Sequence, residues 1–203
     1  MSAAGPLALT PEIDDFRRQF EQLSADADAL VAPLSDTQLH WRSAPDSWSV
    51  AQCIEHLNVT ARLYLPFLDE AIANAIRRGL YGPGPFRYNW IGRLVVFSQG
   101  PPPRFRTRAP ATFEPTAERP RKEIMAAFRA YQVQYIDRLR QANGIDLARA
   151  RVRSPSPYRV RMPLGSGFAF AAAHGRRHLW QARQVIAQLS RAAETRRRGD
   201  DLA

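Results

Sequence analysis

The sequence has little cysteine, little lysine and no long hydrophobic run, and each shortage excludes a class of protein. Cys53 is the only cysteine among 203 residues, so no disulfide can form within the chain. This excludes the disulfide frameworks that hold small secreted domains together. A chain without disulfides fits a reducing compartment, and we therefore expect a cytoplasmic protein.

Hydrophobic runs are short throughout the chain. No apolar stretch approaches the roughly 18 residues that a membrane-spanning helix needs. Residues 1–10 contain no basic segment followed by a hydrophobic one, so no secretory signal is predicted. Hydrophobic residues still make up 45% of the chain, which is enough for one sizeable core. We predict a soluble protein with one domain over residues 1–192 and a flexible charged tail over 193–203.

Lysine is almost absent from a strongly basic chain. The formal net charge is +10 and 29 residues are cationic, yet Lys122 is the only lysine. The arginines are scattered from Arg17 to Arg198, whereas a nucleic-acid-binding protein often gathers them on one face. Net charge alone affects solubility and association and does not identify a partner. We therefore do not predict a nucleic-acid partner.

Four segments carry apolar residues at steps of three and four, which is the spacing of a buried helix face. They span residues 10–34, 49–79, 124–143 and 166–189. Ser49, followed three residues later by Gln52, forms a capping box at the start of the second segment. No run alternates with a period of two for long enough to build a sheet. The sequence therefore predicts an all-α fold, a four-helix bundle.

The connection between the second and third helices is unusually long. Residues 80–115 far exceed what an antiparallel turn needs, so they can cross over and leave these two helices parallel. A short helix over residues 88–99 is predicted within this crossover. The crossover either covers one end of the core or closes over a pocket as a lid.

Two histidines occupy the apolar stripe of the last helix. His174 and His178 are four residues apart, so their rings lie on the same face. A buried imidazole destabilises the fold unless it finds a partner. The pair either hydrogen-bonds to groups of the core or contributes to a metal site, and the spacing alone does not decide between the two.

A third histidine favours the metal site. His56 lies on the flank of the buried stripe of the second helix, so three imidazoles point inward from two helices of one bundle. Three imidazoles with open coordination positions are typical of a catalytic metal site. We place His40 outside this site and interpret Cys53 as a small apolar contact. Glu55 is predicted to form a salt bridge on the surface.

Two stretches of the sequence resemble the DinB-like (DinB/YfiT-like) family of metalloenzymes. They are WRSAPDSWSVAQCIEHL, residues 41–57, and HGRRHLWQ, residues 174–181. The resemblance implies a four-helix bundle in an up-down-down-up arrangement and a homodimer. It also implies a divalent metal ion bound by His56, His174 and His178.

The resemblance leaves the reaction open. It implies a metal-dependent enzyme that activates either a low-molecular-weight thiol or water for attack on a small electrophilic substrate. Zn²⁺, Ni²⁺ and Fe²⁺ all suit imidazole ligands. Arg177 and Gln181 are candidates for contacting the substrate or the ligands. The alternative from a different class is a non-catalytic, stress-associated binding or dimerisation module.

Overall fold

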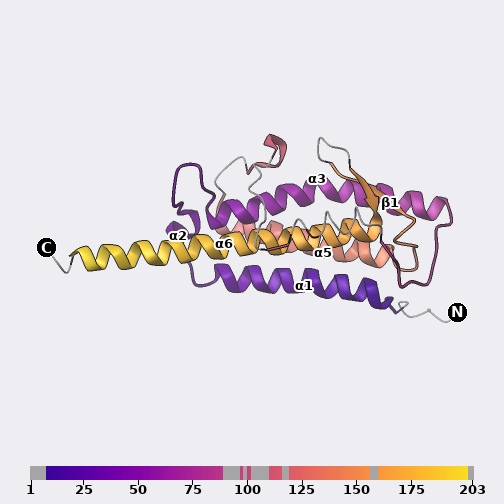
Figure 1. Ribbon diagram of the computed structural model, residues 1–203, viewed down its shortest axis with the longest axis horizontal. Helices are drawn as coiled ribbons and strands as arrows, with labels where there is room; N and C mark the ends of the chain where they lie inside the picture. Colours follow the sequence, from indigo (N-terminus) through magenta and orange to yellow (C-terminus); the bar gives the residue numbers. More distant parts are fainter. Residues whose placement is uncertain are drawn as a thin grey trace.

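Four long helices lie side by side along one axis and form the predicted four-helix bundle (Figure 1). The computed structural model describes residues 8–88, 97, 100–101, 110–115, 119–155 and 160–200. The long helices are α1 Pro11–Val31, α3 Val50–Arg77, α5 Arg121–Gln141 and α6 Leu164–Asp200. The described residues also form the short helices α2 Asp36–His40 and η1 Ala111–Phe113, and the strands β1 Arg151–Arg153 and β2 Arg161–Pro163.

Contacts between side chains fix the relative directions of the helices. Asn58 in α3 donates to the carbonyl of Ile124 in α5, and further along both helices Arg138 pairs with Asp69. One contact joins the beginnings of the two helices and the other joins residues further along both, so α3 and α5 run parallel. On the other side of the bundle α1 and α6 also run in one common direction, opposite to that of α3 and α5 (Figure 1).

The core is built from the apolar stripes that the sequence predicts. In α1 the buried residues recur at steps of three and four, as in Ile13, Phe16 and Phe20. The ring of Phe20 stacks on Tyr135 of α5, with ring centroids 4.7 Å apart. Burying such side chains supplies most of the stability of a helical bundle, since helices in proteins are stabilised mainly by the packing of an apolar face.

α3 begins at the predicted capping box. The Ser49 hydroxyl accepts from the amide of Gln52 at 3.1 Å, and the Gln52 side chain accepts from the amide of Ser49 at 2.9 Å. The helix continues through Pro66 to Arg77. Because the box fixes the first residue of α3, it also fixes which face of the helix carries His56, in the second turn.

Replacing Ser49 with alanine is expected to lower the free energy of unfolding by about 1 kcal/mol, because it leaves a helix amide without its partner. Urea denaturation measures this change. Ser35→Ala is the matched control, since Ser35 makes the same capping box on α2. α2 has only five residues and Ser35 is exposed, so we expect a smaller loss there. A larger loss in the control would contradict the role assigned to Ser49.

A small antiparallel ribbon lies beside the bundle, although the sequence predicts no sheet. β1 pairs with β2 through three residue pairs, with Val152 opposite Met162. Both of these side chains are buried against the helical core. Strands of three residues are too short for alternation to be recognised in a sequence, which explains the difference.

The last helix is longer than predicted. The sequence predicts a flexible tail over residues 193–203, whereas α6 is helical as far as Asp200. Its C-terminal part extends past the ends of the other long helices (Figure 1). Alanine, arginine and glutamate favour helix without burial, and Arg197 and Arg198 in the last turn interact favourably with the helix dipole. Local propensity therefore extends the helix where packing does not.

The crossover from α3 to α5 is described only in part. Most of the short helix predicted over residues 88–99 lies outside the described residues. The described end of the crossover contains η1, and the buried Phe113 packs this segment against α3. In the described part of the chain, none of the helices combines the length and the apolar character that a membrane crossing requires.

Candidate metal centre

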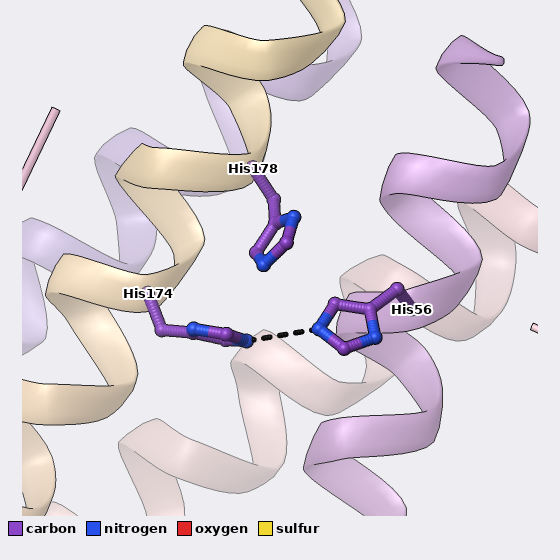
Figure 2. A group of neighbouring side chains, drawn as sticks. All are labelled: His56, His174 and His178. Carbon is purple, nitrogen blue, oxygen red and sulfur yellow. Dashed lines mark hydrogen bonds between the residues drawn. The ribbon is translucent and has the colours of Figure 1, made fainter. Parts of the chain in front are cut away.

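His56 from α3 meets His174 and His178 from α6 inside the bundle (Figure 2). One ligand nitrogen from each ring lies within 4.8 Å of the other two. The ring of His56 is 5.2 Å from that of His174 and 4.4 Å from that of His178, between centroids. His56 and His178 are buried and His174 is partly buried. The structure thus brings together the three histidines that the sequence selects.

The local structure explains this convergence. His174 and His178 are one turn apart in α6, and their ring centroids are 4.4 Å apart. α6 packs closely on α1 next to them, because a Cβ at Gly175 would lie only 2.8 Å from the side chain of Leu23. α3 then brings His56 to the same level of the bundle from the other side (Figure 2).

A backbone carbonyl orients the His56 ring. Nδ1 of His56 lies 2.6 Å from the carbonyl oxygen of Phe113, and a carbonyl can only accept, so Nδ1 carries the proton. Nε2 of His56 is therefore free of hydrogen and keeps its lone pair. This nitrogen faces Nε2 of His174 at 3.1 Å (Figure 2). The hydrogen bond to the Phe113 carbonyl fixes His56 in the tautomer that a metal ligand bound through Nε2 requires.

Burial keeps all three imidazoles uncharged. It is the largest cause that lowers the pKa of His56, lowers that of His174 to about 3, and lowers that of His178 well below its ordinary value. The neighbouring imidazoles and the positive charge of Arg177 lower the pKa values of His174 and His178 further. Neutral imidazole is the form that binds metal ions.

The donor set fits a divalent transition-metal ion. Two nitrogens bound to one Zn²⁺ at about 2.0–2.1 Å in a tetrahedral site lie about 3.3–3.4 Å apart. The 3.1 Å between the Nε2 atoms of His56 and His174 is close to this spacing. One nitrogen of His178 points between the other two rings (Figure 2). The buried Nδ1 atom of His178 has no hydrogen-bond partner among the described residues.

Aromatic rings enclose the three imidazoles. Trp48 lies 4.8 Å from the ring of His56 and 5.8 Å from that of His178, between centroids. Phe170 stacks on His174 at 5.5 Å. Neither residue is predicted from the sequence to belong to the site. The sequence signal for a site role of Trp48 and Phe170 is weak, because an aromatic residue beside the apolar stripe of a helix usually belongs to the core.

The other candidate residues have different surroundings. His40 lies outside the cluster and its ring nitrogens contact the carbonyls of Asp36 and Arg119. Cys53 is buried, and burial raises the pKa of its thiol to about 12. It therefore stays protonated, as expected for an apolar contact. The cluster contains no cysteine or carboxylate ligand from the part of the chain that the structure describes.

Glu55 corrects one expectation from the sequence. The predicted salt bridge is present, with Arg119, but it does not lie on the surface, because only 9% of Glu55 is exposed. Its carboxylate accepts from Asn58 at 2.9 Å and from Arg119 at 3.2 Å. Arg119 follows Phe113 in the crossover, so this ion pair ties the segment that orients His56 to the helix that carries it.

Gln181 and Arg177, the two polar residues noted in the sequence, lie near the cluster. Gln181 lies beside His178 and raises its pKa, which opposes the effect of burial. Its Oε1 atom is buried and has no hydrogen-bond partner among the described residues. Arg177 places a positive charge within range of all three imidazoles.

Comparison with known proteins places the chain in a family. Comparison with curated proteins gives no match. Among solved structures the chain is similar to YfiT from Bacillus subtilis, described as a probable metal-dependent hydrolase with an unusual four-helix bundle topology. The TM-score is 0.51 at 14% sequence identity, over 93% of this chain and 94% of YfiT. Residues 19–182 match the DinB superfamily, so the chain belongs to this superfamily.

Proposed function

We propose that this protein is a divalent-metal-dependent enzyme in which His56, His174 and His178 hold the ion. The nucleophile is water or a low-molecular-weight thiol, and the substrate is a small electrophilic molecule. One observation carries the proposal: three neutral imidazoles from two helices, two of them buried and one partly buried, converge with one nitrogen of each within 4.8 Å of the others. The likeness to YfiT supports the hydrolytic form of the reaction.

A divalent ion in this site would favour activation of a nucleophile. Held by His56, His174 and His178, it would lower the pKa of a bound water or thiol and so would supply hydroxide or thiolate near neutral pH. Because the three imidazoles are neutral, they would leave the positive charge of the ion available for this effect. Zn²⁺, Ni²⁺ and Fe²⁺ are the candidates, since imidazole suits each of them.

The surrounding residues orient the ligands and exclude solvent. The Phe113 carbonyl holds the Nδ1 proton of His56, and Trp48 and Phe170 cover the rings. Arg177 adds a positive charge that favours an anionic nucleophile or substrate. Cys53 is buried and protonated, so the chain offers no thiolate here and a thiol nucleophile comes from a small molecule.

The reaction can be tested by mass spectrometry. Protein loaded with Zn²⁺, Ni²⁺ or Fe²⁺ is incubated with small electrophiles, in water alone or with glutathione, mycothiol or bacillithiol. We expect metal-dependent products that contain either the elements of water or the thiol. His174→Ala, incubated in parallel, should give neither. Metal-free wild-type protein that cannot be loaded would instead favour the non-catalytic binding or dimerisation module.

Arg119→Ala is expected to weaken metal binding about tenfold, which is the usual effect of losing a group that orients a ligand. The variant frees the crossover from Glu55 and so loosens the Phe113 contact to His56. Competition with a chromophoric chelator measures the affinity. Arg129→Ala is the matched control, because Arg129 pairs with Asp28 between α5 and α1. Equal affinities in both variants would remove Arg119 from this role.

A homodimer and a cytoplasmic location remain predictions. Light scattering of purified protein tests the first, and localisation of a tagged chain tests the second. Neither outcome bears on the metal site, because all three histidines belong to one chain.

A further inference from the structure

The outer side of the β1–β2 ribbon carries only arginine among its exposed side chains. Side chains of a strand alternate between its two faces, and Val152 and Met162 point inward and are buried. Arg151, Arg153 and Arg161 therefore share the opposite face, and all three are exposed. We call these three residues the arginine face.

Two members of the arginine face lie directly opposite each other. Arg153 is paired with Arg161 in the ribbon. One pair further along, the amide of Ser154 donates to the carbonyl of Val160 at 2.8 Å. Because hydrogen-bonded and non-hydrogen-bonded pairs alternate in an antiparallel ladder, Arg153 and Arg161 form a non-hydrogen-bonded pair, the kind that brings side chains closer together. Like charges in this position destabilise a sheet.

No carboxylate of the described part of the chain offsets this repulsion. The guanidinium groups of the arginine face form no ion pair or hydrogen bond with the described residues. Asp146 lies shortly before the ribbon, but its carboxylate accepts from two backbone amides of its own turn. Arginines on the helices differ in this respect, as the pair of Arg129 with Asp28 shows. The positive charge of the arginine face is thus available to a partner outside the chain.

The composition of the arginine face restricts the kind of partner. It presents no apolar side chain that could enter a lipid bilayer, as membrane-surface elements do. It presents no aromatic ring, whereas proteins that bind single-stranded nucleic acid stack the bases on such rings. A single small anion gains little on an exposed surface, because water weakens each ion pair there.

The spacing of the charges favours a dense polyanion. Arg151 and Arg153 are two residues apart on one strand, which separates their Cα atoms by about 6–7 Å. Arg161 adds a third charge across the ribbon. Three charges this close need a partner with several negative charges at short intervals. A nucleic-acid duplex provides one for about every 1.7 Å of its axis.

We propose that the arginine face binds the phosphate backbone of a nucleic-acid duplex without reading its base sequence. The guanidinium group matches phosphate oxygens bidentately, and contacts to phosphates carry no sequence information. The ribbon packs on α3 and α6, so these arginines project from a fixed surface. The sequence does not predict this partner, because the pairing of β1 with β2 is what gathers the three arginines.

Fluorescence anisotropy of a short labelled DNA duplex of mixed sequence, titrated at several salt concentrations, tests the proposal. The ribbon variant combines Arg151→Thr, Arg153→Thr and Arg161→Thr, since threonine suits strands. The matched control removes the same positive charge from exposed, ion-paired arginines of α1 and α5 by combining Arg18→Gln, Arg129→Gln and Arg140→Gln.

We expect the ribbon variant to bind the duplex about tenfold or more weakly at low salt. Its affinity should also depend less steeply on salt, by about 2–3 in the log–log slope, because each phosphate contact contributes about 0.9. The control should keep the slope of the wild type. Equal losses in the two variants would show that net charge alone drives binding and would overturn the proposal.

Three other results would also overturn it. They are a wild type that does not bind the duplex at low salt, tighter binding to the single strand than to the duplex, and binding to phosphatidylserine vesicles in place of the duplex. If the ribbon variant does not fold, Arg153→Thr alone decides. We expect it to lower the slope by about 1. Because it relieves the like-charged pair, it should unfold at the same urea concentration as the wild type or a higher one.

The proposal does not depend on the metal centre. The ribbon contributes no member of the histidine cluster, so His174→Ala should bind the duplex as tightly as the wild type. The ribbon variant should likewise keep the Zn²⁺ affinity of the wild type. The two measurements therefore show separately whether the arginine face or the metal site fails.

Discussion

Replacing His174 with alanine is expected to weaken Zn²⁺ binding about a thousandfold. Protein zinc sites bind with roughly 10–16 kcal/mol in total, so one of three protein ligands carries about 4 kcal/mol, which is about a thousandfold in affinity. His174 is the strongest choice for this test, because its Nε2 faces that of His56 at 3.1 Å. A competition titration with a chromophoric chelator, followed by elemental analysis, measures the loss.

The matched control for this prediction is His40→Ala. It also removes a histidine, but His40 contacts the carbonyls of Asp36 and Arg119 and not the cluster. We expect His40→Ala to bind nearly as well as the wild type and His56→Ala to behave like His174→Ala. Circular dichroism establishes that each variant is folded. If His40→Ala and His174→Ala bind Zn²⁺ equally well, the three histidines are not the ligands.

Variants of the three histidines, of Arg119 and of Arg129 have an expected order of effects on the Zn²⁺ affinity. Loss of a ligand should weaken binding most, loss of the Glu55–Arg119 ion pair less, and loss of the exposed Arg129–Asp28 pair least. The order follows from distance to the ion: a ligand contacts it, whereas Arg119 acts through Phe113 and His56. An exposed ion pair elsewhere contributes little to any site.

The helices and the convergence of the three histidines could be predicted from the sequence for the same reason. Steps of three and four between apolar residues define the buried face of α1 and α6 directly, and His174 and His178 occupy positions of that face. His56 follows the capping box of α3, which fixes its helical phase. Polar residues on an apolar face are informative, because they destabilise the fold unless they have a function or a partner.

The environment of the ligands could not be predicted in this way. The group that orients His56 is the carbonyl of Phe113. Because every residue has a backbone carbonyl, no residue type in the sequence indicates this contact. Glu55 pairs with Arg119, which reaches it from the crossover, and a contact between distant segments leaves no periodic pattern. A cavity lined in part by His174 likewise depends on how four helices pack together.

Metal-free protein is expected to lose stability steeply as the pH falls from 7 to 5. The three imidazoles have folded-state pKa values below the ordinary value of 6.5. Below pH 6.5 the imidazoles of the unfolded chain therefore bind protons that those of the folded chain do not bind. The equilibrium then shifts toward unfolding. Each strongly depressed imidazole contributes about 1.4 kcal/mol per pH unit below 6.5, or about 2 kcal/mol at pH 5.

The loss from His174 should continue to about pH 3, where its folded-state pKa lies. Urea denaturation at several pH values measures the slope. Carboxylates also titrate in acid, so the informative quantity is the difference between the wild type and His174→Asn, which keeps a polar side chain that does not titrate. We expect the variant to lose about 2 kcal/mol less than the wild type between pH 7 and pH 5.

Zn²⁺ should raise the stability at each pH in this range by an amount that depends on its concentration and affinity. Because burial keeps the folded imidazoles neutral, protons compete with the ion for these nitrogens only at lower pH. His174→Asn should show little of this gain. A metal-free wild-type stability that stays constant or rises between pH 7 and pH 5 would mean that the imidazoles take up protons in the folded protein at least as readily as in the unfolded chain. Three positive charges cannot share a buried cluster with one nitrogen pair at 3.1 Å, so that result would exclude the arrangement in Figure 2 itself.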